Sequence, residues 1–108
     1  MRIAISAQGP EPGSALDRHF GRAPYFMLVE EDDNMHAIAN KHVDGASGVG
    51  IQTAQLLINH RVTHVLTGEC GPKAMAVLNA GDIQVVTACQ GTVADAIAAF
   101  RNKADTCR

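Results

Sequence analysis

Strand-like and helix-like segments alternate along the second half of this chain, and that alternation restricts the fold more than any other feature. Residues 63–67 (THVLT) and 83–87 (IQVVT) have the apolar, β-branched character of buried strands. Residues 49–59, 72–79 and 93–100 place apolar side chains at helical spacing. Strands that alternate with helices predict a parallel sheet with right-handed crossover connections.

Three residues mark helix boundaries in this half of the chain. Pro72 suits the first turn of a helix, because its missing N–H would have no intrahelical partner there. Gly81 suits the end of that helix. Thr92 can cap the amino end of the last helix, which is amphipathic throughout.

The first half predicts three strands, at residues 2–6, 25–30 and 35–40. The last two flank the polar turn EDDN at 31–34 and therefore form an antiparallel hairpin. The complete order is β-β-β-α-β-α-β-α, an α/β fold with a five-stranded mixed sheet flanked by helices. The second strand then runs opposite to the other four. This order is ribonuclease H-like, but the first strand lacks the carboxylate that a two-metal nuclease requires.

Composition excludes several functional classes. With 108 residues the chain is long enough for one domain with its own core. A formal net charge of -2 gives no general attraction to nucleic acid or to a membrane surface, and 4% aromatic residues without Trp provide no base-stacking platform. No signal peptide is recognisable, and no apolar run approaches the ~20 residues of a membrane helix. We therefore expect a cytoplasmic protein with a single domain over 1–102 and a flexible tail over 103–108.

The three cysteines, Cys70, Cys89 and Cys107, are odd in number and widely spaced, so we expect free thiols rather than a disulfide framework. Cys70 and Cys89 each follow a predicted strand, where converging loops could bring two soft metal ligands together. Cys70 also precedes a helix start, where a thiolate is favoured. The alternative for each is a small buried apolar residue, which is the commoner fate of a free cysteine.

The loop before the second strand concentrates positive charge. Residues 16–26 read LDRHFGRAPYF, and the stretch from Arg18 to Arg22 is Arg-His-Phe-Gly-Arg. In an open α/β sheet, ligands bind beyond the carboxyl ends of the parallel strands, and this loop enters its antiparallel strand at that same edge. The helices that follow the parallel strands also begin there, and their amino ends attract anions. The sequence therefore predicts an anion site at this edge, with the acidic turn at the opposite end.

The predicted site combines these cations with residues of the strand-end loops. Arg18 and Arg22 are expected to clamp an anion through their guanidinium forks. His19 is a candidate metal ligand or donor to an anionic sulfur or oxygen, with a surface histidine paired to a nearby carboxylate as the alternative. Phe20 fits a plug at the base of the loop. The cofactor-binding set is Arg18, His19, Phe20, Gly21, Arg22, His42, Gly68, Cys70, Gly71, Cys89 and Gly91, and the metal-ligand set is His19, Cys70 and Cys89.

No catalytic motif supports an enzyme. The sequence has no nucleophile elbow, no P-loop and no zinc-protease helix. The segment GASGVG at 45–50 does not leave the first strand of a βαβ unit, as a dinucleotide fingerprint requires. A small phosphoryl-binding enzyme would need a positioned base and nucleophile. We therefore expect a binding protein rather than an enzyme.

Taken together, these segments resemble the family of dinitrogenase iron–molybdenum cofactor-binding and cofactor-biosynthesis domains. The resemblance covers nearly the whole chain and rests on RIAISAQG, LDRHFGRAPYF, GASGVGIQTAQLL, VTHVLTGECGPKAMAVLNAGDIQVV and GTVADAIAAF. The chain is similar in particular to stand-alone members from sulfate reducers.

That resemblance implies a ribonuclease H-like fold without catalytic acids. It also implies a molybdenum–copper sulfide cluster held without a full set of protein ligands, with an iron–molybdenum–sulfur or iron–sulfur cluster as the alternative. In cluster-binding members the histidine of the His-Phe-Gly motif is a contact residue, and His19 occupies that position here. The family does not uniformly have cysteine at the positions of Cys70 and Cys89.

Two functional hypotheses follow. The first is a non-catalytic carrier of an anionic metal–sulfide cluster, with a cluster-donor or acceptor protein as its partner. A bulky polyanion with soft sulfur surfaces suits arginines, backbone N–H groups and one aromatic ring better than a tight ligand cage. The second is an interaction or regulatory module whose loop edge docks an acidic partner surface without a cluster. Visible absorption of the loaded protein distinguishes the two.

Overall fold

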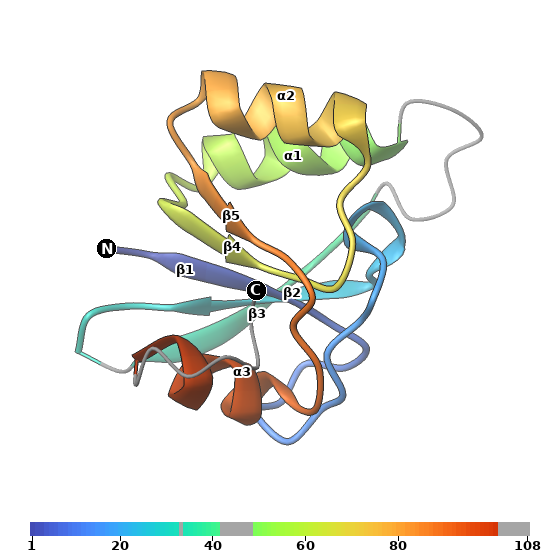
Figure 1. Cartoon of the computed structure of the whole chain (residues 1–108). Coiled ribbons are helices and arrows are strands. Elements are labelled where there is room, and N and C mark those ends of the chain that lie inside the picture. Colours follow the sequence, from blue (N-terminus) through green and yellow to red (C-terminus); the bar gives the residue numbers. More distant parts are fainter. Residues whose placement is uncertain (33, 42–48, 102–108) are drawn as a thin grey trace.

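The computed structural model describes residues 1–32, 34–41 and 49–101, which form one mixed sheet between helices (Figure 1). The strands are β1 (Ile3–Ala7), β2 (Tyr25–Val29), β3 (Met35–Ala39), β4 (His64–Leu66) and β5 (Gln84–Val86). The helices are α1 (Val49–Asn59), α2 (Pro72–Ala80) and α3 (Val93–Arg101), with a short 3-10 turn η1 (Phe20–Arg22). The predicted β-β-β-α-β-α-β-α order is confirmed, and η1 is the one addition to it among the described residues.

The sheet has the strand order β3-β2-β1-β4-β5. β2 pairs antiparallel with both β1 and β3, whereas β4 pairs parallel with β1 and with β5. The predicted strand directions are therefore confirmed, since β2 alone is reversed. The carboxyl ends of the other four strands meet at one edge of the sheet, and the loop into β2 reaches the same edge.

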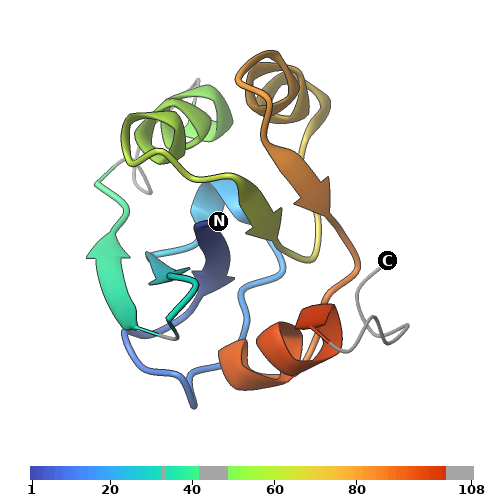
Figure 2. The ribbon, with the colours of Figure 1, turned by 90° about the vertical axis from the view of Figure 1, so that its left-hand side faces the viewer.

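Helices cover both faces of the sheet: α1 and α2 lie on one face and α3 lies on the other (Figures 1 and 2). Because successive strand residues point to opposite faces, each strand contributes to two separate cores. The core toward α1 and α2 includes Ala4, Phe26, Leu28, Leu57, Val65 and Leu78. The core toward α3 includes Ile3, Ile5, Met27, Val29, Leu66, Val93 and Ile97.

The helix boundaries follow the predicted residues. Pro72 is the first residue of α2, and the N–H of Gly81 closes its end by donating to the carbonyls of the last turn. At the start of α3, the Thr92 hydroxyl accepts the Asp95 N–H at 3.1 Å, and the Asp95 carboxylate accepts the Thr92 N–H at 3.0 Å. This reciprocal cap satisfies two N–H groups that the helix itself leaves unpaired.

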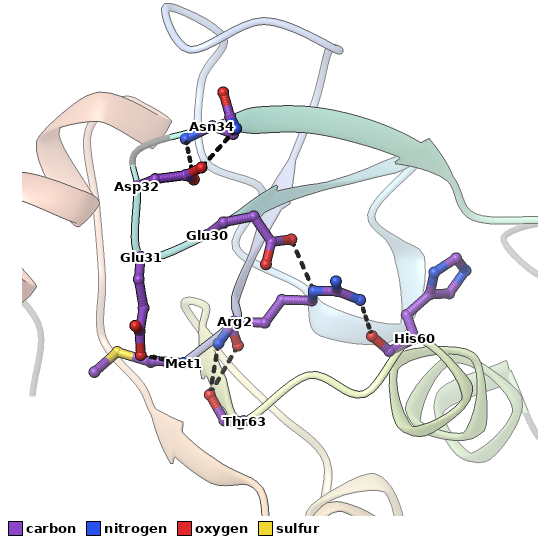
Figure 3. A network of polar contacts seen from close by, with 8 residues as sticks. All are labelled: Met1, Arg2, Glu30, Glu31, Asp32, Asn34, His60 and Thr63. Atoms are coloured by element: carbon purple, nitrogen blue, oxygen red, sulfur yellow. Dashed lines mark hydrogen bonds and ion pairs between the residues drawn. The ribbon is translucent and has the colours of Figure 1, made fainter.

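The acidic turn between β2 and β3 (Figure 3) lies at the opposite end of the sheet from the loop into β2, where the anion site is predicted (Figure 1). The amino group of Met1 contacts the Glu31 carboxylate at 2.6 Å, which lowers the pKa of that carboxyl. Arg2 pairs with Glu30 at 2.8 Å and also donates to the His60 carbonyl. Positive and negative groups therefore pair with one another at this end of the molecule.

No helix in the described part of the chain is long and apolar enough to span a membrane. The predicted tail at 103–108 lies outside the described residues.

Candidate functional site

The first part of the long loop between β1 and β2 is attached to the start of α3. Ala15 forms a bridge with Thr92, and the Leu16 N–H donates to the Gly91 carbonyl at 2.9 Å. Gly91 has φ +91°, and a Cβ there would lie 2.6 Å from an Asp95 carboxylate oxygen, so only glycine fits. This structural role accounts for Gly91 without a ligand, and its predicted cofactor contact stays a prediction.

The second part of the loop is attached to the end of β4. Glu69 donates its N–H to the Arg18 carbonyl at 2.6 Å, and its own carbonyl accepts the Phe20 N–H at 3.0 Å. Gly68 allows this approach, because a Cβ there would lie 2.7 Å from the Arg18 carbonyl oxygen. Behind this contact, the Ser6 hydroxyl bonds to the Asp17 carbonyl. The Arg-His-Phe-Gly-Arg segment is thus fixed to the carboxyl edge of the sheet.

Phe20 anchors the segment in the core toward α1 and α2. Its side chain is 1% exposed and meets Phe26 edge-to-face with ring centroids 5.4 Å apart. This position agrees with the expected plug at the base of the loop. Gly21 then lies directly on α1, since a Cβ on it would be 3.2 Å from the Cα of Gly50. The aromatic plug and the glycine contact together set the height of the loop above the helix.

A hollow of about 430 Å³, here called the helix hollow, lies where the amino ends of α1 and α2 converge on this loop. Neither helix has an acidic residue in its first turn, and the residue that caps α2, Gly71, has no side chain. The first N–H groups of a helix lack intrahelical partners and give its amino end partial positive charge. Exposed Lys73 adds a full positive charge. The lining residues are Phe20, Gly21, Val49, Gly50, Ile51, Gly71, Pro72, Lys73 and Ala74.

A second hollow of about 680 Å³, here called the strand-end hollow, lies beyond β4 and β5 and has mixed charge. Arg18 and Glu69 bring opposite charges to it, so it favours an anion less than the helix hollow does. Ala88 has φ +62°, a left-handed conformation that costs a non-glycine residue about 1–2 kcal/mol. The lining residues are Arg18, Gly68, Glu69, Ala88, Cys89 and Gln90.

His19 lies between residues that line the two hollows, and its side chain is 62% exposed. Its Nδ1 is 3.6 Å from a Glu69 carboxylate oxygen, and its backbone N–H donates to Asp17. In this structure His19 is therefore a surface histidine beside a carboxylate, which was the alternative to a metal ligand. A role in contacting a ligand stays a prediction.

The two candidate cysteines point into different cores. Cys70 packs against the core toward α1 and α2, and burial raises the pKa of its thiol from 9.0 to about 11. The thiol is therefore protonated at neutral pH, against the expectation of a favoured thiolate. Cys89 is 3% exposed in the core toward α3, and its thiol donates to the Val86 carbonyl at 3.7 Å. The sheet separates these two sulfurs.

The structure does not bring the three predicted metal ligands together. Within the residues it describes, no three His, Cys, Asp or Glu side chains form a group that could hold a metal ion. The predicted cofactor-binding residues divide instead between the hollows. Phe20, Gly21 and Gly71 line the helix hollow; Arg18, Gly68 and Cys89 line the strand-end hollow.

Of the other predicted residues that the structure describes, none lines either hollow: His19, Arg22, Cys70 and Gly91. Arg22 is exposed at the end of η1, beside Gly21. His42 lies outside the described residues. Sequence reasoning left Gly50 and Lys73 out of the binding set, although both lie in the first turn of a helix that begins at the predicted edge. Gly50 could have been found because it lies inside a predicted helix. A glycine destabilises a helix at such a position, so its presence there indicates a close approach by another part of the structure.

Comparison with known proteins gives results consistent with this geometry. The model of the family described as dinitrogenase iron–molybdenum cofactor matches residues 1–103. An uncharacterized protein of Methanocaldococcus jannaschii is 34% identical over 104 residues, covering 93% of this chain and 85% of that protein.

Two solved structures are similar over nearly their full length. The apo form of the orange protein from Desulfovibrio gigas superimposes with a TM-score of 0.93 at 33% identity, covering 99% of this chain and 90% of that one. A putative NifB protein from Thermotoga gives a TM-score of 0.84 at 30% identity, covering 95% and 89%. The chain belongs to the dinitrogenase iron–molybdenum cofactor family.

Proposed function

We propose that this protein binds and carries an anionic metal–sulfide cluster in the helix hollow, without catalysing a reaction on it. One observation carries the proposal: two helix amino ends, neither with an acidic residue in its first turn, converge on the hollow beside the Arg-His-Phe-Gly-Arg loop. Membership of the iron–molybdenum cofactor family supports a cluster as the cargo.

The lining of the helix hollow suits a polyanion with a sulfur surface. Backbone N–H groups at helix amino ends donate to anions without side-chain rearrangement. Lys73 adds charge, while Ile51, which is 41% exposed, offers an apolar contact to soft sulfur. Gly21 and Gly50 let the loop and the two helices approach one another around the hollow, because a Cβ on Gly21 would meet Gly50 and a Cβ on Gly50 would meet Ala74. Binding of this kind needs no cage of cysteine and histidine side chains.

For the composition of the cargo we propose a molybdenum–copper sulfide cluster, and an iron–molybdenum–sulfur or iron–sulfur cluster is the alternative. His19, Arg18 and Arg22 would contact the cluster from the loop side, where their exposed side chains can reach over the edge. A cluster-donor or acceptor protein would meet the protein at this same edge. We place the protein in the cytoplasm.

Cluster uptake by charge variants tests this proposal. Tetrathiomolybdate, with and without copper(I), is added anaerobically to each protein, and retained visible absorption is measured after gel filtration. Lys73→Ala, His19→Ala and the double variant Arg18→Ala with Arg22→Ala are expected to retain less cluster. Arg61→Ala removes one positive charge beyond the far end of α1 and is expected to retain as much as wild type.

If all four variants retain as much cluster as the wild-type protein, the proposed site is overturned. An absence of retained colour in the wild-type protein would favour the alternative, a module that docks an acidic partner without a cluster.

A further inference from the structure

Among the residues that the structure describes, β3 is an open edge strand whose backbone is available for pairing. It is the outermost strand of the sheet next to β2 (Figure 2). Asn40 donates to the Pro24 carbonyl and Glu30 donates to the Asn34 carbonyl, so even-numbered β3 residues bond to β2. Because directions alternate in an antiparallel pair, the N–H and C=O groups of Met35, Ala37 and Ala39 point away from the sheet.

Features that usually protect an edge strand are missing from β3. Its sequence, MHAIA, contains no proline and no Lys, Arg, Asp or Glu, which are common edge blockers. Met35 is 38% exposed, and His36 and Ala39 are exposed as well. A groove of about 340 Å³ between β3 and α3 extends this apolar surface. It is lined by Met35, Ala94, Ile97, Ala98 and Arg101. By comparison, the opposite edge strand, β5, has three residues.

We infer that two copies of this chain pair antiparallel through β3, about a two-fold axis at Ala37. In this register Ala37 faces its own copy, and Met35 of one copy lies opposite Ala39 of the other. A long side chain thus meets a small one on the α3 face at both ends of the pair. The two sheets become one continuous sheet, and neither copy keeps an open β3 edge.

Charge complementarity favours this antiparallel arrangement. Lys41 lies two residues beyond the end of β3, and the turn with Glu31 and Asp32 precedes the strand (Figure 3). Antiparallel pairing brings Lys41 of one copy to the acidic turn of the other, and the two-fold axis makes this contact twice. Parallel pairing would place Lys41 against Lys41 instead. Opposite charges across such contacts favour one orientation over another more than they add affinity.

Pairing through β3 leaves cargo binding independent. Since β3 runs parallel to β1, antiparallel pairing directs the carboxyl edges of the two copies to opposite ends of the joined sheet. The helix hollow of each copy therefore stays accessible, and a failure of either proposal leaves the other standing.

Amide hydrogen exchange of the wild-type protein tests the inference without any substitution. In the monomer the amides of Met35, Ala37 and Ala39 should exchange fast, while those of His36 and Ile38 exchange slowly. In the dimer all five should be protected. Above the dissociation constant the monomer fraction falls with the square root of concentration, so a hundredfold rise should slow the first three by about tenfold.

Exchange of the charges at Lys41 and Asp32 tests the antiparallel orientation of the two copies, with dimerisation measured by sedimentation. Lys41→Glu alone and Asp32→Lys alone each place like charges together at both ends and should weaken dimerisation on the order of tenfold. An equimolar mixture of the two variants restores an attractive contact at both ends and should recover the dimer. Arg61→Glu, away from β3, should dimerise as wild type does.

Several results would overturn the inference. One is a monomer at every concentration with fast exchange at Met35, Ala37 and Ala39. A second is a dimer in which these amides still exchange fast, because its interface would lie elsewhere. A third is protection that does not depend on concentration, which would mean that the chain covers its own edge. Failure of the mixture to recover the dimer would exclude the antiparallel register.

Discussion

Replacement of Gly68 by alanine should destabilise the protein and displace the loop that carries Arg18 and His19. The new Cβ would lie 2.7 Å from the Arg18 carbonyl oxygen and 2.8 Å from its Cα, whereas relaxed contacts lie near 3.5–4.0 Å. Both neighbours are backbone atoms, so the loop must move rather than a side chain. Overpacking of this kind costs about 1–3 kcal/mol. Gly68→Ala should therefore remain folded, but with a clearly reduced free energy of unfolding.

Gly13→Ala is the matched control, because a Cβ on Gly13 has no neighbour within 4 Å. It should leave the free energy of unfolding unchanged or raise it by about 0.4–1 kcal/mol, through lower entropy of the unfolded chain. Urea denaturation measures the free energy of unfolding of both variants. Equal m-values would show that unfolding exposes the same amount of surface in each variant as in the wild-type protein. Amide shifts should change from Arg18 to Phe20 in Gly68→Ala alone. If Gly68→Ala unfolds within about 0.5 kcal/mol of wild type, the close approach of loop and strand end is refuted.

Three further predictions test other parts of the structure. Ala88→Gly should stabilise the protein by up to about 1 kcal/mol, because it relieves a left-handed alanine at φ +62°. Ala98→Gly, on the exposed surface of α3, is the control and should instead destabilise the protein by about 1 kcal/mol. Thermal unfolding of both variants and of the wild-type protein measures the two changes. The pKa of Cys70 is raised from 9.0 to about 11, so the folded protein keeps this proton longer than the unfolded chain. The protonated Cys70 thiol therefore contributes its full stability to the folded protein below pH 9, and this contribution is lost as the pH rises toward 11. Urea midpoints measured against pH should show this loss in the wild-type protein and not in Cys70→Ala. Asn40→Ala should cost about 1–3 kcal/mol in urea denaturation, because Asn40 is 4% exposed and its side-chain amide donates to the Thr53 hydroxyl; a loss below 0.5 kcal/mol would contradict that buried bond.

Much of the fold could be predicted from sequence because its signals are local. Apolar period and length separate the strands from the helices, and Pro72, Gly81 and Thr92 lie at helix boundaries as expected. Alternation of strands and helices then sets the direction of the parallel strands. The reversal of β2 follows from the polar turn before β3.

The site was harder to predict for two reasons. The direction of a side chain after a strand depends on whether the number of intervening residues is odd or even, and several contacts of the site are made by backbone segments that are distant in the sequence. Cys70 and Cys89 occupy similar places after their strands, yet they point into cores on opposite sides of the sheet. One residue more or less after a strand reverses the direction of a side chain, and spacing alone does not fix this in a loop. Likewise, nothing local to His19 indicates that Glu69 lies beside it, since a bridge between distant segments makes the contact.

The carrier function is tested most directly by an anaerobic titration of the metal-free protein with tetrathiomolybdate, with and without copper(I), followed by amide NMR shifts. Phosphate at the same concentrations is the control anion. We expect saturable shifts around Phe20 and Gly21, in the first turn of α1, and from Gly71 to Ala74, and weaker shifts with phosphate. An equal response to phosphate, or no shifts around the helix hollow, would contradict a metal–sulfide site there.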